Sequence, residues 1–425
     1  NIWDIFCKDG GHIYENQTGD VACDQYHRYK EDVQIMKEMG MKAYRFSLSW
    51  ARIMPEGTGA VNEKGLEYYD NLINELLDNG IEPFVTLYHW DLPYALHLQG
   101  GWMNPNSPSW FYEYAKVVAE HFSDRVKNFF TINEPQCIVG LGYQTGEHAP
   151  GLKVGPSDYF RIWHNVLKAH GRAVEALREF SKQPVKISMA PCGALYVPET
   201  NKPEDIEAAR KANFSLPENS IGACSWDVAL CCDPVYLGQY PEDILKEFGQ
   251  FFPKVTDADM KLISQPLDFF GQNIYNAVTV RAGEDGKAVR AARYDGFPQT
   301  AIGWPVTPEV LYWAPKFMQE RYKKPFMITE NGMASHDWVG VDGKVHDQAR
   351  VDFMARYLGA YKRAAEDGVD LAGYFAWSVM DNFEWAYGYS QRFGLVYTDY
   401  NTQKRIWKDS AYFYKNIIET NGENL

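Results

Sequence analysis

The sequence of 425 residues has no long apolar run, no block of like charges and no low-complexity tract. No apolar segment approaches the roughly 20 residues that a membrane-spanning helix needs, so we expect a soluble protein with no membrane partner. Acidic residues outnumber basic ones by 56 to 42, which gives a formal net charge of −14. This balance argues against nucleic acid as a partner, because polyanions are bound through basic surfaces.

Cysteine is scarce and shows no pairing pattern. The chain has seven cysteines, an odd number, and no CxxC motif. This usage is typical of a reduced chain with buried thiols and disfavours a disulfide scaffold. We therefore expect a cytoplasmic protein rather than a secreted one.

Several catalytic motifs are also missing. There is no GxxxxGK[ST] phosphate loop, no GxSxG elbow, no HExxH and no HxH pair. The glycines of GLGYQTG, residues 140–146, miss the spacing of a dinucleotide-binding loop. Nucleotide-dependent, serine-hydrolase and metal-dependent chemistries are therefore weakly supported.

The sequence is instead rich in alternating helical and apolar segments. Hydrophobic residues make up 45% of the chain and aromatic residues 15%, which is typical of a large globular core. Residues 28–40 have apolar side chains on one helical face and stop at Gly40. Residues 62–80 predict a second amphipathic helix, with Asn62 placed to cap it and Gly80 ending it.

Seven segments are predicted to be strands, and helical segments separate most of them. Each is apolar on both faces, as expected for parallel strands that are covered by helices. The segments are residues 43–50, 81–91, 126–135, 185–192, 266–275, 325–332 and 371–382. This pattern predicts an α/β fold with one domain over residues 1–425, a (β/α)₈ TIM barrel. Since a barrel of this type has eight strands, we expect its first strand to lie upstream of Asn1.

The carboxyl ends of these strands carry polar and aromatic residues that packing does not require. In a (β/α)₈ barrel, chemistry occurs at these ends. The residues are Arg45, Trp50, His89, Trp90, Asn133, Glu134, Asn273, Tyr275, Glu330, Asn331 and Trp377. A lone His89 could be a structural histidine or a substrate-binding residue, and the sequence leaves both interpretations open.

Two of the strands end in glutamate, in TINEP (131–135) and in PFMITENG (325–332). Strands four and seven of an eight-stranded barrel face one another, so we expect Glu134 and Glu330 to converge. Two carboxylates about 5–5.5 Å apart can hydrolyse a glycosidic bond with retention. One would stay protonated and the other ionised as the nucleophile. A single strand-end glutamate is more often a solvated loop residue, but two of them, each beside an asparagine, weigh against that reading.

Longer motifs then identify a family. YRFSLSW, LYHWDLP, TINEP, FFGQNIY, ITENG and WSVMDNFEWAYGYSQRFGLVY occur along the chain. Together they closely resemble the family-1 glycoside hydrolases, the β-glucosidase family, over nearly the whole chain. The resemblance implies a retaining exo-β-glycosidase that releases terminal non-reducing β-D-glucosyl residues, with β-galactosyl and β-fucosyl residues as further candidates. It implies no cofactor and no metal, and its partners would be small β-glucosides or cello-oligosaccharides.

The resemblance also implies roles for individual residues. Glu134 would be the general acid/base and Glu330 the nucleophile, positioned and kept ionised by Arg45 and Tyr275. Asn133 would hold the 2-hydroxyl of the sugar, Glu384 would grip its outer hydroxyls, and Trp377 would form a stacking floor or a part of the core. The remaining residues of the sugar pocket would be His89, Trp90 and Trp385.

Some features depart from the family or leave alternatives open. The family's first strand normally ends in a glutamine that grips the sugar, and nothing in this chain supplies it. Ile274 stands where the family often has tyrosine. Glu384 favours a neutral sugar over a phosphorylated one, because a carboxylate would repel a phosphate. A non-catalytic carbohydrate-binding protein on the same barrel is the alternative function, although both glutamates are present.

For the side of the site that binds the leaving group, we predict a platform of loop tryptophans, Trp304 first, then Trp163 and Trp338. The sequence does not indicate an oligomeric state.

Overall fold

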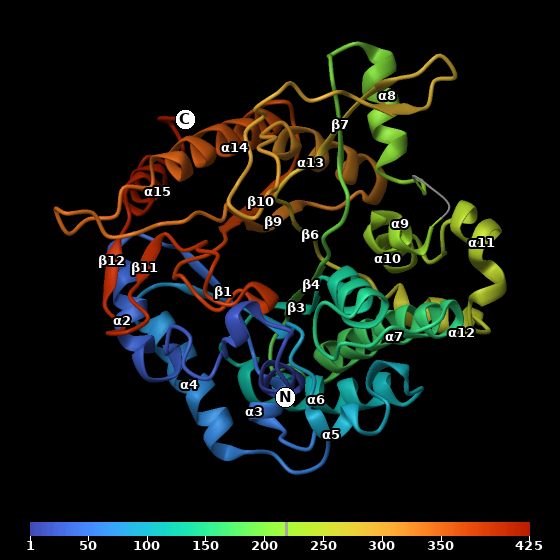
Figure 1. The fold of residues 1–425 in the computed structure, drawn as a ribbon. Helices are drawn as coiled ribbons and strands as arrows, with labels where there is room; N and C mark the ends of the chain where they lie inside the picture. The colour runs from blue at the N-terminus through green and yellow to red at the C-terminus, as the bar shows by residue number, and fades with distance from the viewer. Residues whose placement is uncertain (217–219) are drawn as a thin grey trace.

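Seven parallel strands form the central wall of the protein in the computed structural model, which describes residues 1–216 and 220–425 (Figure 1). All seven predicted strands are confirmed, each over a shorter range than predicted. They are β1 (Ala43–Ser47), β2 (Glu82–Tyr88), β3 (Asn128–Asn133), β4 (Lys186–Ala190), β6 (Phe270–Asn273), β9 (Phe326–Asn331) and β10 (Leu371–Ala376).

The strands follow one another around the wall in chain order. Parallel ladders join β1 to β2, β2 to β3 and β3 to β4, and a second set joins β6 to β9 and β9 to β10. Between the two sets, the amide of Asp268 donates to the carbonyl of Ile187 at 3.0 Å, which brings β6 beside β4. A cavity of about 960 Å³ lies between β1 and β10 and is lined by both strands. That a further strand precedes Asn1 stays a prediction.

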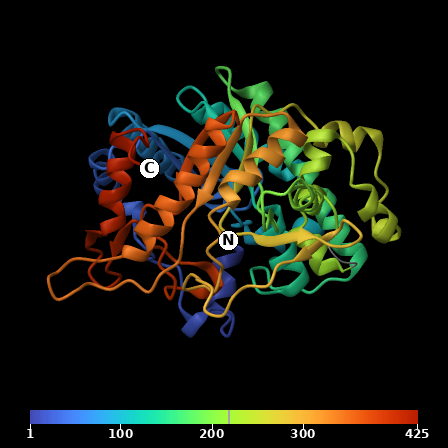
Figure 2. The same cartoon turned by 90° about the horizontal axis from the view of Figure 1, so that it is seen from above.

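Helices surround this wall as an outer ring, which the two cartoon views show from different sides (Figures 1 and 2). The longer ones are α2 (Gln25–Glu38), α4 (Glu63–Asp78), α6 (Ser107–Phe122), α7 (Pro156–Phe180), α8 (Pro203–Ala212), α10 (Val228–Leu237), α13 (Val310–Tyr322), α14 (Gln348–Glu366) and α15 (Asp409–Glu419). The shorter ones are α1 (Ile2–Lys8), α3 (Trp50–Ile53), α5 (Tyr94–His97), α9 (Ile221–Trp226), α11 (Glu242–Phe248) and α12 (Asp257–Ile263). Alternation of parallel strands with covering helices is the arrangement that the apolar strands predicted.

Smaller elements extend from the loops at the strand ends. Strands β5 (Tyr196–Pro198), β7 (Val278–Ala282) and β8 (Ala288–Arg290) form a separate sheet in the order β5-β7-β8. Strands β11 (Val396–Thr398) and β12 (Arg405–Trp407) pair antiparallel. Short helical turns complete the fold: η1 (Tyr14–Asn16), η2 (Gly101–Met103), η3 (Cys137–Thr145), η4 (Gly249–Phe251) and η5 (Trp385–Tyr387).

Both helices that were predicted in detail are present, with one difference at the N-cap of α4. Helix α2 ends before Gly40 and α4 ends before Gly80, and both glycines have a positive φ, +80° and +73°. Such a backbone conformation favours glycine, which explains where the helices stop. Asn62 does stand at the N-cap of α4, but its side chain makes no capping hydrogen bond. Its amide donates to the carbonyl of Arg52 at 2.9 Å instead, so the predicted capping bond is wrong.

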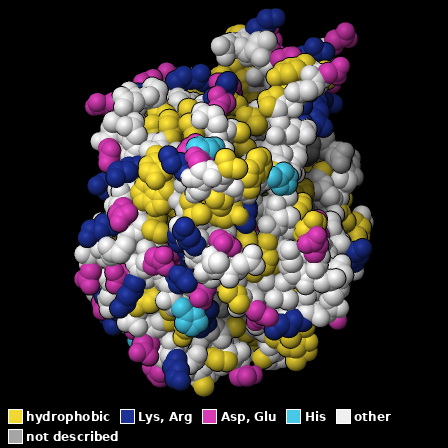
Figure 3. Space-filling model, turned by 60° about the vertical axis from the view of Figure 1, so that its left-hand side comes forward, with side chains coloured by type: hydrophobic (Ala, Val, Ile, Leu, Met, Phe, Trp, Pro, Cys, Tyr) yellow, Lys and Arg dark blue, Asp and Glu magenta, His cyan; other side chains and the backbone are white. Residues whose placement is uncertain are grey.

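The surface and the thiols agree with the composition. On the face shown in Figure 3, basic and acidic side chains are interspersed. All seven cysteines are free, as predicted, and six of them are buried. Among the described residues, no helix combines the length and the apolar character that crossing a membrane requires.

A buried group of ion pairs ties together the loops that follow β9 and β10. The Lys408 ammonium lies 2.6 Å from an oxygen of Asp337, in the loop after β9, and 2.8 Å from an oxygen of Asp381, in the loop after β10. All three side chains are almost completely buried. Removing one partner of such a group leaves uncompensated charge in a dry environment.

We therefore expect Lys408→Met to destabilise the fold by about 3–5 kcal/mol. The measurement is the midpoint of chemical or thermal unfolding, compared with Lys415→Met. Lys415 is a half-exposed lysine that pairs with Glu419 on the surface, and the loss of a surface pair costs at most about 1 kcal/mol. Equal effects of the two substitutions would contradict a structural role for the buried group.

Candidate active site

Glu330, near the end of β9, has a hydrogen-bond partner for each of its carboxyl oxygens. Its side chain is buried, and one oxygen accepts a hydrogen bond from the Arg45 guanidinium at 2.7 Å. Its other oxygen accepts from the Tyr275 hydroxyl at 2.6 Å. A fixed cation and a neutral donor both favour the ionised form of a carboxyl group. The predicted partners of Glu330 are therefore in place.

Glu134, directly after β3, lies in a different environment. It is buried, and its backbone φ of +43° lies in the left-handed region, which is uncommon for glutamate. Burial, followed by the negative charge of Glu330, raises the pKa of Glu134 to about 7, and hydrogen bonds from Asn273 and Cys137 oppose the shift. The structure thus places a carboxyl group with a raised pKa, Glu134, at the same end of the wall as one whose two oxygens accept hydrogen bonds from a cation and a hydroxyl group, Glu330.

Strand register brings the two glutamates to the same end of the wall. In the ladder between β6 and β9, Asn273 lies opposite Glu330. The side-chain amide of Asn273 donates to Glu134 at 2.8 Å and to Asn133 at 3.1 Å. Arg45 likewise donates to both Glu330 and Asn133. These shared donors join the tips of β1, β3, β6 and β9 in one hydrogen-bonded network.

His89 lies at the end of β2 as a neutral histidine. Burial and the neighbouring Arg45 cation lower its pKa to about 3. Its Nε2 lies 3.2 Å from the amide nitrogen of Asn133. Because the amide oxygen of Asn133 already accepts from Arg45 and Asn273, the amide nitrogen donates and the histidine accepts. The Nδ1 hydrogen of His89 is then available for another group.

Aromatic rings extend the site away from the glutamates. The His89 ring is stacked with Trp377 at 5.9 Å and with Trp385 at 5.9 Å, measured between ring centroids. Trp90 lies 4.9 Å from Trp385, and its indole donates to the carbonyl of Asn133 at 2.9 Å. Flat rings around paired carboxyl groups are suited to the apolar faces of a sugar.

Glu384 supplies a third acidic group near the same centre. Desolvation, followed by the charges of Glu330 and Glu134, raises its pKa to about 8, and Trp377 lowers it in part. The influence of both glutamates on Glu384 reflects its position near them in space, although the loop that carries it is remote in the sequence.

The predicted aromatic platform is only partly supported. Trp304 packs against Tyr275, with ring centroids 5.0 Å apart, and so lies beside a residue that contacts Glu330. Trp338 lies in an exposed loop. Trp163 was expected in a loop, but it lies inside helix α7 and is completely buried. The prediction for Trp163 is wrong, because its helix turns the ring into the core rather than toward the surface.

Two further strand-tip residues belong to the framework rather than to the site. Trp50 is fully buried, and its indole donates to the carbonyl of Gly57 at 3.0 Å. Asn331 is also buried and bonds to the carbonyl of Ile274 at 2.7 Å and to the hydroxyl of Tyr374 at 2.8 Å.

The residues that contact Glu134 directly were not predicted from the sequence. Asn273 was noted as a strand-tip residue without a role, and Cys137 was not singled out. The Cys137 thiol donates to Glu134 at 3.1 Å from the start of η3, a π-helical segment. Thr329 orients Asn273 by donating to its amide oxygen at 2.6 Å. The only sequence signal for Cys137 was its place three residues after Glu134.

Comparison with known proteins agrees with this geometry. The family model "Glycosyl hydrolase family 1" matches residues 1–423. The chain is 46% identical to "Beta-glucosidase A" of Thermotoga maritima over 425 residues, which covers 99% of this chain and 92% of that protein. It is 38% identical to "Bifunctional beta-D-glucosidase/beta-D-fucosidase" of Bifidobacterium breve, covering 98% of this chain and 92% of the relative.

A solved structure supports the same relationship. The structure titled "Beta-glucosidase from Thermotoga maritima in complex with glucoimidazole" superposes with a TM-score of 0.89 at 46% identity, covering 99% of this chain and 93% of that one. The TIM-barrel prediction is confirmed by this similarity together with the parallel wall of strands. With the family match over residues 1–423, the paired glutamates and the barrel have one explanation: the chain belongs to glycosyl hydrolase family 1.

Proposed function

We propose that this protein is a retaining exo-β-glucosidase, with Glu330 as nucleophile and Glu134 as general acid/base. One observation carries the proposal: two glutamates at the same end of the wall are prepared for opposite protonation states. Arg45 and Tyr275 donate hydrogen bonds to the two oxygens of Glu330, contacts that suit a carboxylate, while burial and the charge of Glu330 raise the pKa of Glu134 to about 7. A retaining glycosidase needs such a pair.

The reaction then proceeds in two displacements. An oxygen of Glu330 attacks the anomeric carbon, and Glu134 gives its proton to the departing oxygen. A covalent glycosyl-enzyme remains, and Glu134 is now a carboxylate. In the second step Glu134 removes a proton from water, which attacks the anomeric carbon and releases both the sugar and Glu330. The chain's own carboxyl groups supply every proton transfer in this scheme.

The residues around the pair are assigned to the sugar. Asn133 uses one N–H toward His89, and we assign its other N–H to the 2-hydroxyl. His89 contributes its Nδ1 hydrogen, and Glu384 binds the outer hydroxyls. Trp377 forms the floor, and Trp90 and Trp385 line the pocket. The names of the two curated relatives support a β-glucosyl substrate, and that of the Bifidobacterium breve protein supports β-fucosyl residues in addition. We retain β-galactosyl residues as a further candidate.

The leaving group contacts a more open part of the site. We propose Trp304 as its platform, because it packs on Tyr275 and is only partly buried. β-Glucosides and cello-oligosaccharides are the substrates that we propose.

The seven free thiols favour a reducing compartment, and we propose that the protein is cytoplasmic.

The test is hydrolysis of p-nitrophenyl β-D-glucoside followed by proton NMR from the first seconds. Release of the β-anomer of glucose, with slow appearance of the α-anomer by mutarotation, is the expected result for retention. Parallel assays with the β-galactoside and the β-fucoside define sugar selectivity. A first-formed α-anomer would overturn the double displacement, and binding without product would favour the carbohydrate-binding alternative.

The proposal also predicts the direction of the pH dependence. Because the acid must be protonated and the pKa of Glu134 is raised to about 7, kcat/KM should fall as the pH rises through about 7. Removing Asn273, a donor that lowers this pKa, should move the falling limb to higher pH. A hydrogen bond to a charged group contributes roughly 1.5 kcal/mol or more, equivalent to about one pH unit.

The measurement is the profile of kcat/KM against pH for the wild type and Asn273→Ala. Since Asn273 also supports Asn133, the rate itself should drop, and the position of the limb is the informative quantity. A shift of the limb to lower pH would contradict the assigned role of Glu134.

A further inference from the structure

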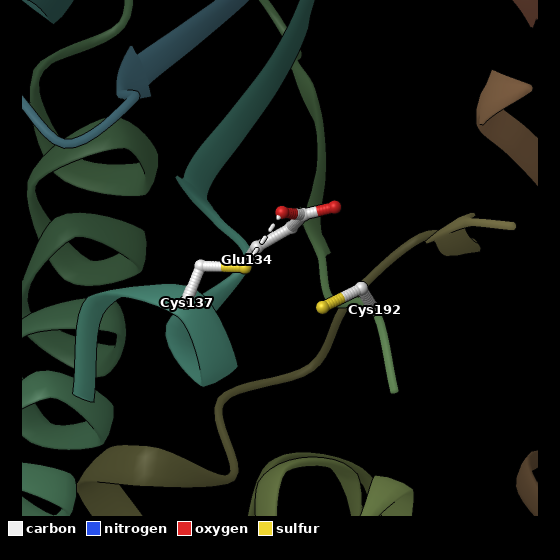
Figure 4. A group of neighbouring side chains, drawn as sticks. All are labelled: Glu134, Cys137 and Cys192. Carbon is white, nitrogen blue, oxygen red and sulfur yellow. Dashed lines mark hydrogen bonds between the residues drawn. The ribbon is translucent and has the colours of Figure 1, made fainter. Parts of the chain in front are cut away.

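Three potential metal ligands meet beside the proposed acid/base. Glu134, Cys137 and Cys192 are all buried, and each offers a ligand atom within 4.8 Å of the other two. Figure 4 shows the three side chains converging from the end of β3, from the start of η3 and from the segment after β4. The Cys137 thiol already contacts Glu134 at 3.1 Å. The mechanism above uses Glu134 but neither thiol as a reactant.

The backbone around the cluster is firmly placed. The side-chain amide of Gln136 donates to the carbonyl of Cys192 at 2.7 Å and accepts from its backbone N–H at 3.3 Å. This pair of bonds fixes the segment after β4 against the residue that precedes Cys137. The two cysteines therefore face each other from a fixed scaffold, and only their side chains need to rotate.

The donor set fits a thiophilic cation. A tetrahedral ion with metal–sulfur bonds of about 2.3 Å places its ligand atoms roughly 3.8 Å apart. The Cys137 sulfur lies 3.1 Å from an oxygen of Glu134, and all three ligand atoms lie within 4.8 Å of one another, which is compatible with that value. Two sulfurs and one carboxylate oxygen fill three positions of the tetrahedron and leave the fourth for water. Mg²⁺ and Ca²⁺ do not fit this donor set, because they require oxygen ligands.

Charge balance favours a divalent ion. Binding through two thiolates and the Glu134 carboxylate releases two thiol protons, and the carboxyl proton where Glu134 holds one, while one dication enters. The buried cluster then gains at most one negative charge beside Glu330 and Glu384. A monovalent ion would leave an additional negative charge among these carboxyl groups.

We propose that Glu134, Cys137 and Cys192 form an inhibitory site for a thiophilic divalent cation such as Zn²⁺ or Cd²⁺. This inference rests on the proposed function, because inhibition follows from the role of Glu134. A carboxylate oxygen bound to the metal can neither deliver a proton to the leaving group nor accept one from water. Within residues 1–216 and 220–425, this is the single cluster of three such ligands at this spacing.

The experiment is a titration of the protein with Cd²⁺, in which binding and activity are measured on the same sample. Binding is measured by the ultraviolet absorption of the thiolate–cadmium bond, and activity by p-nitrophenol release. In the wild type, absorption should saturate at one equivalent, activity should fall with it, and a chelator should restore both. Mg²⁺ should have no effect on either.

The deciding variant is Cys192→Ala, because the proposed reaction does not use Cys192. Its absorption should weaken, and the inhibitory Cd²⁺ concentration should rise at least about tenfold. Cys192→Ser gives a second variant of nearly unchanged volume. Cys224→Ala is the matched control, because Cys224 is another buried free thiol outside the cluster, and it should behave as the wild type.

Unchanged inhibition in both Cys192 variants would overturn the proposed site. So would a lack of thiolate–cadmium absorption in the wild type. The absorption also separates this inference from the proposed function. Cadmium absorption that depends on Cys192, in a protein without glucosidase activity, would overturn the inhibitory role and the proposed function while showing that the cation binds at the cluster.

Discussion

Replacing Glu330 with glutamine should lower kcat on p-nitrophenyl β-D-glucoside by about 10⁴-fold or more, a loss comparable to that of other covalent nucleophiles. The glutamine amide is a poor nucleophile, and it carries no charge to stabilise the developing positive charge on the sugar. Arg45 would also lose its anionic partner. The covalent intermediate therefore cannot form at a useful rate.

Glu320→Gln is the matched control for this variant. Glu320 is an exposed glutamate that pairs with Arg210 on the surface, so its loss should leave kcat near the wild-type value. Thermal unfolding of both variants shows whether they are folded. A folded Glu330→Gln protein that retained a tenth of the activity would exclude Glu330 as the nucleophile.

The second large effect is expected from Glu134→Ala, and it should depend on the leaving group. Cellobiose releases a poor leaving group that needs a proton, so its kcat/KM should fall by about 10²–10⁴-fold, the usual contribution of general acid catalysis. An aryl glucoside with an acidic phenol needs little proton donation, and its kcat/KM should fall far less. kcat/KM is the appropriate quantity because it reports the first displacement.

The same variant should lose the falling limb of activity near pH 7, because burial and the charge of Glu330 raise the pKa of this particular carboxyl group to that value. Glu120→Ala, at an exposed glutamate of helix α6 that pairs with Lys116, serves as the control. Equal losses of kcat/KM for cellobiose and for the aryl glucoside would argue against Glu134 as the acid.

Much of this protein could be predicted from its sequence because the signals are local. Apolar runs predicted all seven strands of the wall, and Glu134 and Glu330 lie at the ends of two of these runs. The left-handed backbone after α2 and α4 was signalled by Gly40 and Gly80. The unpatterned cysteines correctly predicted free thiols. Each of these features depends on a few neighbouring residues or on composition alone.

The tertiary structure alone determined which groups touch. Asn273 and Glu134 are 139 positions apart, and their hydrogen bond exists because β3, β4 and β6 lie side by side in the wall. The same packing buried Trp163 inside α7 and brought Cys192 to Cys137. The pKa of Glu134 likewise depends on burial and on the charge of Glu330, which arrives from another strand. Local pattern therefore specified the strands and the reactive residues at their ends, whereas burial and long-range contacts, which no local pattern encodes, set the protonation and the partners of those residues.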